Sequence, residues 1–153
     1  MDEITPLTDT ALLASVHESA FDTPWSEAEF ATLMGKSGAR AFGTADGFIL
    51  VQGLGGGALG ADEMSGQEAE IITLAVRPTA RRAGLAARLI PHAQAAMAAV
   101  RIFLEVAADN EAARTLYQKH GFVVTGRRKA YYKRADARRV DAVLMQGDFP
   151  PAM

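Results

Sequence analysis

An arginine-rich segment, Val76–Arg88, carries the most suggestive chemistry in the sequence. It follows an apolar run, turns at Pro78 and Gly84, and leads into a helical pattern, with four arginines and no acidic residue. A helix N-terminus presents unpaired backbone N–H groups and the positive end of the helix dipole, and both favour phosphate oxygens. Gly84 lets the backbone approach an anion closely, and the small Ala86 permits a second close approach. The segment therefore predicts a phosphate-binding loop, although a solvated basic loop explains it equally well when it is taken alone.

A second candidate is a carboxylate inside an apolar strand. Glu105 interrupts the run Arg101–Val106. Such a carboxylate either faces solvent on the other side of the sheet or lies in a cleft as a base, and the residue alone favours the exposed alternative. Asn110 is interpreted first as a helix cap, and Tyr117, seven residues later at helical spacing, first as a core residue.

Residue types exclude several other chemistries. The chain has no cysteine, which removes disulfides, thiolate metal sites and a cysteine nucleophile, and its 3 histidines are dispersed, so we expect no metal site. Residues 55–60 (GGGALG) match the dinucleotide pattern GxGxxG, but that pattern requires a helix directly after the glycines. Residues 61–66 end in another glycine instead. We interpret the stretch Gly53–Gly66 as a flexible connection or an irregular hairpin tip.

Length and composition describe the setting of these residues. The chain has 153 residues, of which 49% are hydrophobic and 22% charged, and both values are typical of one globular domain. We expect a single domain over residues 1–153, with 147–153 forming a loose tail. The acidic start and the lack of an 18-residue apolar run predict a soluble cytoplasmic protein with no signal peptide and no membrane span.

Charge is divided unevenly along the chain. Residues 1–70 hold 12 Asp and Glu against 2 Lys and Arg, for a net charge of −10. Residues 71–153 hold 14 Lys and Arg against 6 acidic residues, for a net charge of +8. This asymmetry predicts an acidic surface and a basic surface that serve different partners.

Hydrophobic periodicity predicts the elements that position these residues, in the order strand, two helices, three strands, helix, strand, helix and two strands. A strand–helix–strand step requires a right-handed crossover and parallel pairing, so we expect a mixed sheet with helices on both faces, an α/β or α+β fold. Thr8 or Asp9 caps the first helix, Ser26 and Glu29 form a capping box, and Pro91 should kink its helix or remove a hydrogen bond. The expected strands are Glu3–Thr5 (ended by Pro6), Arg40–Thr44, Gly47–Val51, Ala69–Val76, Arg101–Val106, Phe122–Thr125 and Val140–Met145, and one helical stripe comprises Leu85, Leu89, Ala93, Ala96, Met97 and Val100.

The ordered set of motifs resembles the GNAT N-acetyltransferase superfamily. Arg-x-x-Gly-x-Ala at residues 81–86, after the strand ending in Leu74-Ala75-Val76, is similar to the acetyl-CoA signature of that superfamily. Ala86 stands where a second glycine is more common, and the stretch Gly53–Gly66 looks longer than the usual hairpin. The similarity to the second half of the superfamily rests on Leu104-Glu105-Val106, Asn110, Ala113, Leu116-Tyr117 and Gly121-Phe122. The similarity to the RimI-type ribosomal-protein alanine N-acetyltransferases rests on Pro24-Trp25-Ser26, Arg127-Arg128, Tyr131-Tyr132 and Asp141-Ala142.

The resemblance, which covers roughly residues 20–146, implies a particular fold and a co-substrate. The fold is a mixed, mostly antiparallel, twisted sheet of about six to seven strands, with helices on both faces and a V-shaped splay between its two central parallel strands. Acetyl-CoA would lie in that V, with no metal. The cofactor-binding residues implied by the resemblance are Leu74, Ala75, Val76, Arg81, Arg82, Ala83, Gly84, Leu85, Ala86 and Asn110, with Arg77 and Arg88 adding positive charge.

The resemblance also implies acetyl transfer to a protein N-terminal amine, most closely the N-terminal alanine of a small-subunit ribosomal protein. Glu105 would take the proton of the amine and Tyr117 would protonate the leaving thiolate. Glu70 is the rival base, because strand alternation places it with Ile72 and Leu74 on one face. The acidic first half of the chain would face a basic acceptor.

Other interpretations stay open. The acceptor could be a small-molecule amine or a lysine side chain, or the chain could be a CoA-binding module without catalysis. The segment Arg127–Arg139, with 7 Lys and Arg against Asp136, is either a solvated loop or a contact for the acceptor or for ribosomal RNA. A nucleic-acid-binding domain is disfavoured by the net charge of −2.

Overall fold

The computed structural model describes residues 3–56 and 67–150, which form one seven-stranded sheet with four helices. The strands and helices follow the predicted order. Within those ranges, no helix is long and apolar enough to cross a membrane. The elements are β1 (Thr5–Leu7), α1 (Thr10–Ala20), α2 (Glu27–Met34), β2 (Ala39–Thr44), β3 (Gly47–Gly56), β4 (Gln67–Val76), α3 (Leu85–Ala96), β5 (Ala99–Ala107), α4 (Glu111–Lys119), β6 (Phe122–Lys133) and β7 (Arg139–Asp148).

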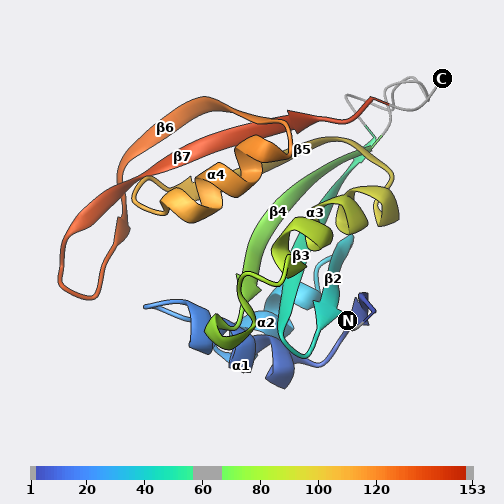
Figure 1. The fold of residues 1–153 in the computed structure, drawn as a ribbon, viewed down its shortest axis with the longest axis horizontal. Helices are drawn as coiled ribbons and strands as arrows, with labels where there is room; N and C mark the ends of the chain where they lie inside the picture. The colour runs from blue at the N-terminus through green and yellow to red at the C-terminus, as the bar shows by residue number, and fades with distance from the viewer. Residues whose placement is uncertain (1–2, 57–66, 151–153) are drawn as a thin grey trace.

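The sheet has the strand order β1-β2-β3-β4-β5-β7-β6. Only β4 and β5 are parallel, joined by the crossover helix α3, and the other neighbours are antiparallel. In Figure 1 the strands run close together at the upper right and then spread into two arms, one holding β2 to β4 and the other holding β6 and β7. The mixed, mostly antiparallel sheet with a central splay is confirmed.

Helices cover both faces of the sheet over two separate cores. Strand β3 alternates between them, because Phe48 and Leu50 face α1 and α2 whereas Ile49 and Val51 face α3. Each buried side chain of this size stabilises the fold by about 1.5–3 kcal/mol. The core beneath α3 and α4 includes Phe42, Leu89, Ile90, Ile102, Tyr117, Phe122 and Met145, and the core beneath α1 and α2 includes Leu13, Val16, Phe30, Ala41 and Ala75.

The predicted helix starts are confirmed. The Asp9 carboxylate accepts hydrogen bonds from the backbone N–H groups of Ala11 and Leu12, and Ser26 and Glu29 form the reciprocal capping box. These contacts satisfy donors that have no partner inside their helices.

Pro91 lies within the continuous helix α3 and removes one helical hydrogen bond. A proline has no N–H to donate to the carbonyl four residues earlier, which here is that of Ala87. His120, the C-terminal cap of α4, places its Nε2 3.2 Å from that oxygen, and its Nδ1 lies 3.0 Å from the Leu116 carbonyl. The proline therefore frees a carbonyl that α4 uses to dock against α3.

Several predicted boundaries are wrong. Pro6 lies within β1 rather than ending it, which an edge strand tolerates. Val100 belongs to β5 and not to the helical stripe, because α3 ends at Ala96 and the chain turns through Ala98 with a positive φ of 50°. The predicted loose tail is also wrong at its start, since β7 runs to Asp148 and the Phe149 ring packs on Phe122 at 5.7 Å.

Two predicted loops are partly strands. Strands β6 and β7 are longer than expected, so most of the segment Arg127–Arg139 forms a β-hairpin rather than a solvated loop. Residues Gly53–Gly56 continue β3 and pair with β4, which corrects the first part of the predicted flexible connection. The rest of that prediction, together with most of the GxGxxG match at 55–60, lies outside the described residues.

Candidate active site

The site begins where the two parallel strands separate. Strands β4 and β5 pair from Gln67 to Ile71, whose partner is Leu104, and no pairs follow. Beyond that point β4 stays with β3 as far as Val76, and β5 stays with β7 as far as Ala107. The last residues of both strands thus lose their neighbour across the gap, which leaves backbone groups of β4 available to a ligand.

An irregularity in β4 coincides with the separation. Thr73 pairs with Leu50 and Ile71 with Val51, so Ile72 is an extra residue on β4, a β-bulge. Ile72 packs towards α1 and α2 whereas Leu74 packs on the α3 core. The prediction that Glu70, Ile72 and Leu74 share one face is therefore wrong for Leu74, because the bulge shifts the alternation by one residue.

A cleft fills the gap between the strands and brings together residues from five parts of the chain. It joins the splayed ends of β4 and β5 to α4, to the α1–α2 connection and to the β6–β7 hairpin. Its lining residues are His17, Phe21, Thr23, Trp25, Ile71, Ile72, Thr73, Leu74, Leu104, Glu105, Val106, Ala107, Asn110, Ala113, Tyr117, Tyr132 and Arg134.

Glu105 lies in this cleft with its side chain 23% exposed. Its neighbours Leu104 and Val106 are buried in the α3 core, so the carboxylate faces the other side of the sheet. An oxygen of Glu105 lies 3.1 Å from a guanidinium nitrogen of Arg128, which comes from β6 and stacks over the Tyr131 ring. The carboxylate is thus held by the hairpin at the edge of the gap.

Glu70 lies close enough to Glu105 for the two carboxylates to interact. Burial raises the pKa of Glu70, and the charge of Glu105 raises it further, against the opposing effects of Arg128 and Lys36. Glu70 pairs with Phe103, where the strands are still joined, and it is not among the residues that line the cleft. Two carboxylates therefore occupy the same region, one within the cleft and one below the point of separation.

Tyr117 reaches the cleft from α4 and is only 6% exposed. Its ring packs 5.6 Å from that of Phe122, and burial raises the pKa of its phenol well above the usual value. Tyr132 lines the same cleft from β6, and burial, followed by the charge of Glu105, raises its pKa too. Both phenols are therefore kept neutral as hydrogen-bond donors.

The loop before α3 has the geometry of an anion site. Gly84 is the N-cap with a positive φ of 80° and makes no side-chain cap. The first backbone bond within the helix runs from Arg88 N–H to the Gly84 carbonyl at 3.1 Å, so the N–H groups of residues 85–87 have no partner inside the helix. The Arg81 Nε donates to the Val76 carbonyl, which folds this arginine onto the end of β4.

Arg77 does not join this loop. Its guanidinium donates to the Ala45 carbonyl at 3.0 Å and to the Ser15 hydroxyl at 3.1 Å, so it ties β4 to the β2–β3 turn and to α1. The positive charge that the resemblance assigned to Arg77 is thus engaged in holding the fold.

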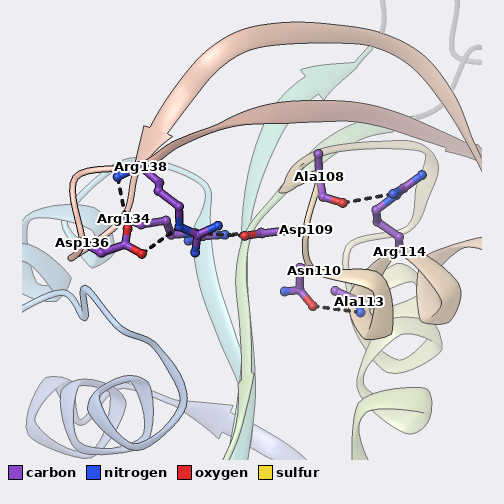
Figure 2. A network of polar contacts seen from close by, with 8 residues as sticks. All are labelled: Ala108, Asp109, Asn110, Ala113, Arg114, Arg134, Asp136 and Arg138. Atoms are coloured by element: carbon purple, nitrogen blue, oxygen red, sulfur yellow. Dashed lines mark hydrogen bonds and ion pairs between the residues drawn. The ribbon is translucent and has the colours of Figure 1, made fainter.

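Asn110 caps α4 and lines the cleft. Its side-chain oxygen accepts a hydrogen bond from the Ala113 N–H at 3.2 Å, so its amide nitrogen is left as the group that can donate. Figure 2 shows Asn110 beside an ion pair between Asp109 and Arg134, where Arg134 comes from the end of the β6–β7 hairpin. This pair connects the hairpin to the β5–α4 loop at the border of the cleft.

The structure therefore brings Glu105, Tyr117, Asn110 and Leu74 into one cleft. Sequence reasoning missed the wall formed by His17, Phe21 and Trp25 and the contributions of Tyr132 and Arg134. Of these residues, the sequence motifs pointed only to Trp25, in Pro24-Trp25-Ser26, and to Tyr132, in Tyr131-Tyr132. Nothing local in the sequence places residues 17–25 opposite β5, because the packing of α1 on β4 does so.

A model of the acetyltransferase (GNAT) family matches residues 7–122, which span the splayed strands, the loop before α3 and Tyr117. The chain belongs to the GNAT acetyltransferase family. It is an acetyl-CoA-dependent N-acetyltransferase with acetyl-CoA as co-substrate. Groups of three or more His, Cys, Asp or Glu side chains that could hold a metal are absent from residues 3–56 and 67–150.

Relatives of this GNAT enzyme, and the solved structure of one similar protein, match between 83% and 100% of the chain. It is 32% identical over 150 residues to the [Ribosomal protein bS18]-alanine N-acetyltransferase of Escherichia coli K12, covering 95% of this chain and 96% of that protein. It is 31% identical over 132 residues to N-alpha-acetyltransferase RimI of Mycobacterium tuberculosis, with 83% and 77% coverage. The crystal structure of the E. coli ribosomal-protein-S18-alanine N-acetyltransferase superposes with a TM-score of 0.81 at 26% identity, covering 100% of this chain and 97% of the other.

Proposed function

We propose that this enzyme transfers acetyl from acetyl-CoA to the N-terminal α-amine of a protein, with an N-terminal alanine followed by basic residues as the preferred acceptor. The observation that carries the proposal is the 32% identity, over 95% of the chain, to an enzyme named as an alanine N-acetyltransferase of a ribosomal protein. The preference for basic residues after the alanine is proposed from the acidic first half of the chain. A ribosomal protein N-terminus fits these requirements, and such an acceptor places the reaction in the cytoplasm.

Glu105 is the proposed general base. An α-amino group titrates near 8, so much of it is protonated at neutral pH and must lose a proton before it attacks the thioester carbon. Glu105 takes that proton, directly or through one water, because it lines the cleft whereas Glu70 lies where β4 and β5 are still paired. Attack by the neutral amine forms the carbon–nitrogen bond and a tetrahedral intermediate. Glu105, having passed its first proton to solvent, takes the second proton from the nitrogen, and the carbon–sulfur bond then breaks. A positioned base of this kind contributes roughly 10² to 10⁴ in rate.

Tyr117 is the proposed acid. A thiolate leaving group has a conjugate pKa of about 8.5 if cysteine is a guide, which is below that of a phenol. Because burial raises the Tyr117 pKa further, Tyr117 hydrogen-bonds the thiolate first and passes its proton only as negative charge gathers on sulfur. The proton that Glu105 received then restores the phenol through solvent.

The remaining residues bind and orient acetyl-CoA. The free N–H groups at the start of α3 hold the pyrophosphate, Arg81 and Arg82 add charge beside them, and Asn110 donates to the CoA arm. Backbone amides of Leu74 to Val76, which have no β5 neighbour, pair with the pantetheine chain and stabilise the tetrahedral oxyanion.

CoA release with hexapeptides tests this proposal. One peptide begins Ala-Arg with a free α-amine, and its matched control has the same sequence with a blocked N-terminus and one free lysine. We expect turnover with the first peptide only. Turnover with the blocked peptide alone would identify a lysine acetyltransferase, and activity on small amines without either peptide would identify a small-molecule enzyme, and either result overturns the proposed acceptor.

A further inference from the structure

His17 is a buried titratable residue in the cleft wall that the proposed chemistry does not use. It lies in the last part of α1, is 2% exposed, and lines the cleft together with Phe21 and Trp25. A polar ring that is fully buried requires hydrogen-bond partners, and this one has a partner on each ring nitrogen.

The two partners fix the tautomer of the ring. The backbone N–H of Trp25 donates to His17 Nδ1 at 3.0 Å, and a backbone N–H can only donate, so Nδ1 carries no proton. In the neutral ring the proton is then on Nε2, which donates to the Thr73 hydroxyl at 3.2 Å. One imidazole therefore joins the α1–α2 connection to β4.

The same ring forms the centre of an aromatic stack. Phe21 and Trp25 both lie nearly parallel to it, with centroids 4.2 and 4.8 Å away and interplanar angles of 18° and 17°. Phe30 closes the edge in a T-shaped contact at 5.3 Å. Because three aromatic rings meet on His17, removal of the imidazole would leave Phe21 and Trp25 without the surface that orients them.

The point of attachment on β4 is the origin of the splay. Thr73 follows the bulged Ile72, two residues after the last pair between β4 and β5. Strand β5 forms no backbone pair with β4 at Thr73. The His17–Thr73 bond thus attaches the wall to β4 just beyond the point where β4 and β5 separate.

We propose that His17 is a positioning residue that holds the segment Phe21–Trp25 against the bulge of β4 and so shapes the acceptor side of the cleft. This inference rests on the proposed function. The wall stands on the face of the sheet where Glu105 emerges, away from the loop before α3. His17 therefore affects the acceptor amine and leaves acetyl-CoA binding alone.

Variants of His17 separate positioning from simple stability. His17→Ala removes both hydrogen bonds, whereas the side-chain amide oxygen introduced by His17→Asn can still accept from the Trp25 N–H. The matched control is Val16→Ala, which empties a fully buried position on the same helix that does not line the cleft. We expect His17→Ala to raise the KM for the acceptor peptide at least tenfold with the KM for acetyl-CoA within twofold, His17→Asn to recover most of the loss, and Val16→Ala to leave both KM values near wild type.

Trp25 gives a readout that does not depend on turnover, because it is the chain's single tryptophan. We expect its emission to shift to the red in His17→Ala, which removes both the stacked imidazole and the hydrogen bond to the Trp25 N–H. The shift should be smaller in His17→Asn, which keeps that hydrogen bond, and absent in Val16→Ala. Equal rises in both KM values, or unchanged Trp25 emission in His17→Ala, would overturn the inference. If the wild type acetylates no peptide α-amine while acetyl-CoA still binds, the proposed function fails, and the emission of His17→Ala then decides the role of His17 by itself.

Discussion

At the residue scale, the two neighbouring carboxylates provide a direct test of the base. Glu105 and Glu70 come from adjacent strands and interact, but only Glu105 lines the cleft. We expect Glu105→Gln to lower kcat roughly 10² to 10⁴-fold at pH 8, with the KM for acetyl-CoA unchanged, because the amide cannot accept the proton. Glu70→Gln is the matched control, and its kcat at pH 8 should stay within about threefold of the wild-type value. Steady-state kinetics measure both kcat values. A larger loss of kcat in Glu70→Gln than in Glu105→Gln would identify Glu70 as the general base.

Tyr117 makes a separate prediction about pH. Burial raises the pKa of its phenol, so the hydroxyl keeps its proton throughout the neutral and mildly alkaline range. We expect Tyr117→Phe to lower kcat roughly 10² to 10⁴-fold, as the loss of a positioned proton donor does. We also expect that ionisation of Tyr117 causes no fall in the wild-type rate below about pH 10. A decline near pH 8 to 9 that vanishes in Tyr117→Phe would contradict this assignment.

His17 links the cleft wall to the pH dependence of stability. Burial lowers its pKa from 6.5 to about 4, although the charge of Glu29 opposes the shift. Between these values the unfolded chain binds the proton and the folded chain does not, so stability rises with pH and is lost as pH falls from 6.5 to 4. Over this range the free energy of unfolding falls by about 3 kcal/mol because of His17. Chemical denaturation at pH 7 and pH 4.5 should show a smaller loss in His17→Asn than in wild type, and equal losses would contradict the buried neutral ring.

At the element scale, the start of α3 combines helix capping with proposed phosphate binding. Ala87 is exposed in the first turn of this helix. We expect Ala87→Glu to stabilise the helix by about 0.3–1 kcal/mol, because a negative charge suits a helix N-terminus. The same charge repels the CoA phosphates, so the KM for acetyl-CoA should rise about tenfold, or roughly 1.4 kcal/mol.

The neutral variant Ala87→Gln is the control for this change, since it has nearly the same size without the charge. Its KM for acetyl-CoA should stay near that of the wild type. Stability is measured by thermal unfolding without ligand and KM by CoA release. If both variants raise KM equally, side-chain size rather than charge is responsible, and the phosphates lie elsewhere.

Elements were predictable wherever the signal was local. The capping residues Asp9 and Ser26 and the order of strands and helices follow from the sequence, because caps and hydrophobic periodicity act over a few residues. The bulge at Ile72 was not predictable, since it exists only through pairing with β3. Val100 failed for a related reason: its apolar side chain fits a helical stripe or a buried strand equally well, and only the pairing of β5 decides between them.

The site was predictable to the same degree. Glu105, Asn110 and Tyr117 stand in motifs that a family resemblance can carry, and the structure places all three in one cleft. His17 gave no such signal, because its role arises from Thr73, 56 residues away along the chain, and from the rings that stack on it. Residues that shape a cleft through tertiary contacts are beyond the reach of local patterns.

At the scale of the whole molecule, the structure changes the meaning of the charge asymmetry. The basic segment Arg127–Arg139 is largely neutralised, because four of its seven Lys and Arg form ion pairs with carboxylates. Surface pairs of this kind stabilise little but cancel the local field. This weakens the alternative that the hairpin binds RNA. The acidic side chains near the α1–α2 wall, Glu18, Asp22, Glu27 and Glu29, are exposed, and in the described residues none of these four is part of an ion pair.

An unpaired acidic rim beside the cleft should attract a basic acceptor through the long-range field. Interactions between exposed charges are screened over about 10 Å at 0.1 M salt, so attraction of this kind weakens as salt is added. For a peptide that begins Ala-Arg-Lys, we expect kcat/KM to fall about tenfold between 20 mM and 0.5 M salt, within the range of electrostatic steering. An Ala-Ser-Gln peptide of equal length should change less than twofold over the same range. Equal salt dependence of the two peptides would mean that salt acts on acetyl-CoA or on the fold, and that the acidic rim does not select the acceptor.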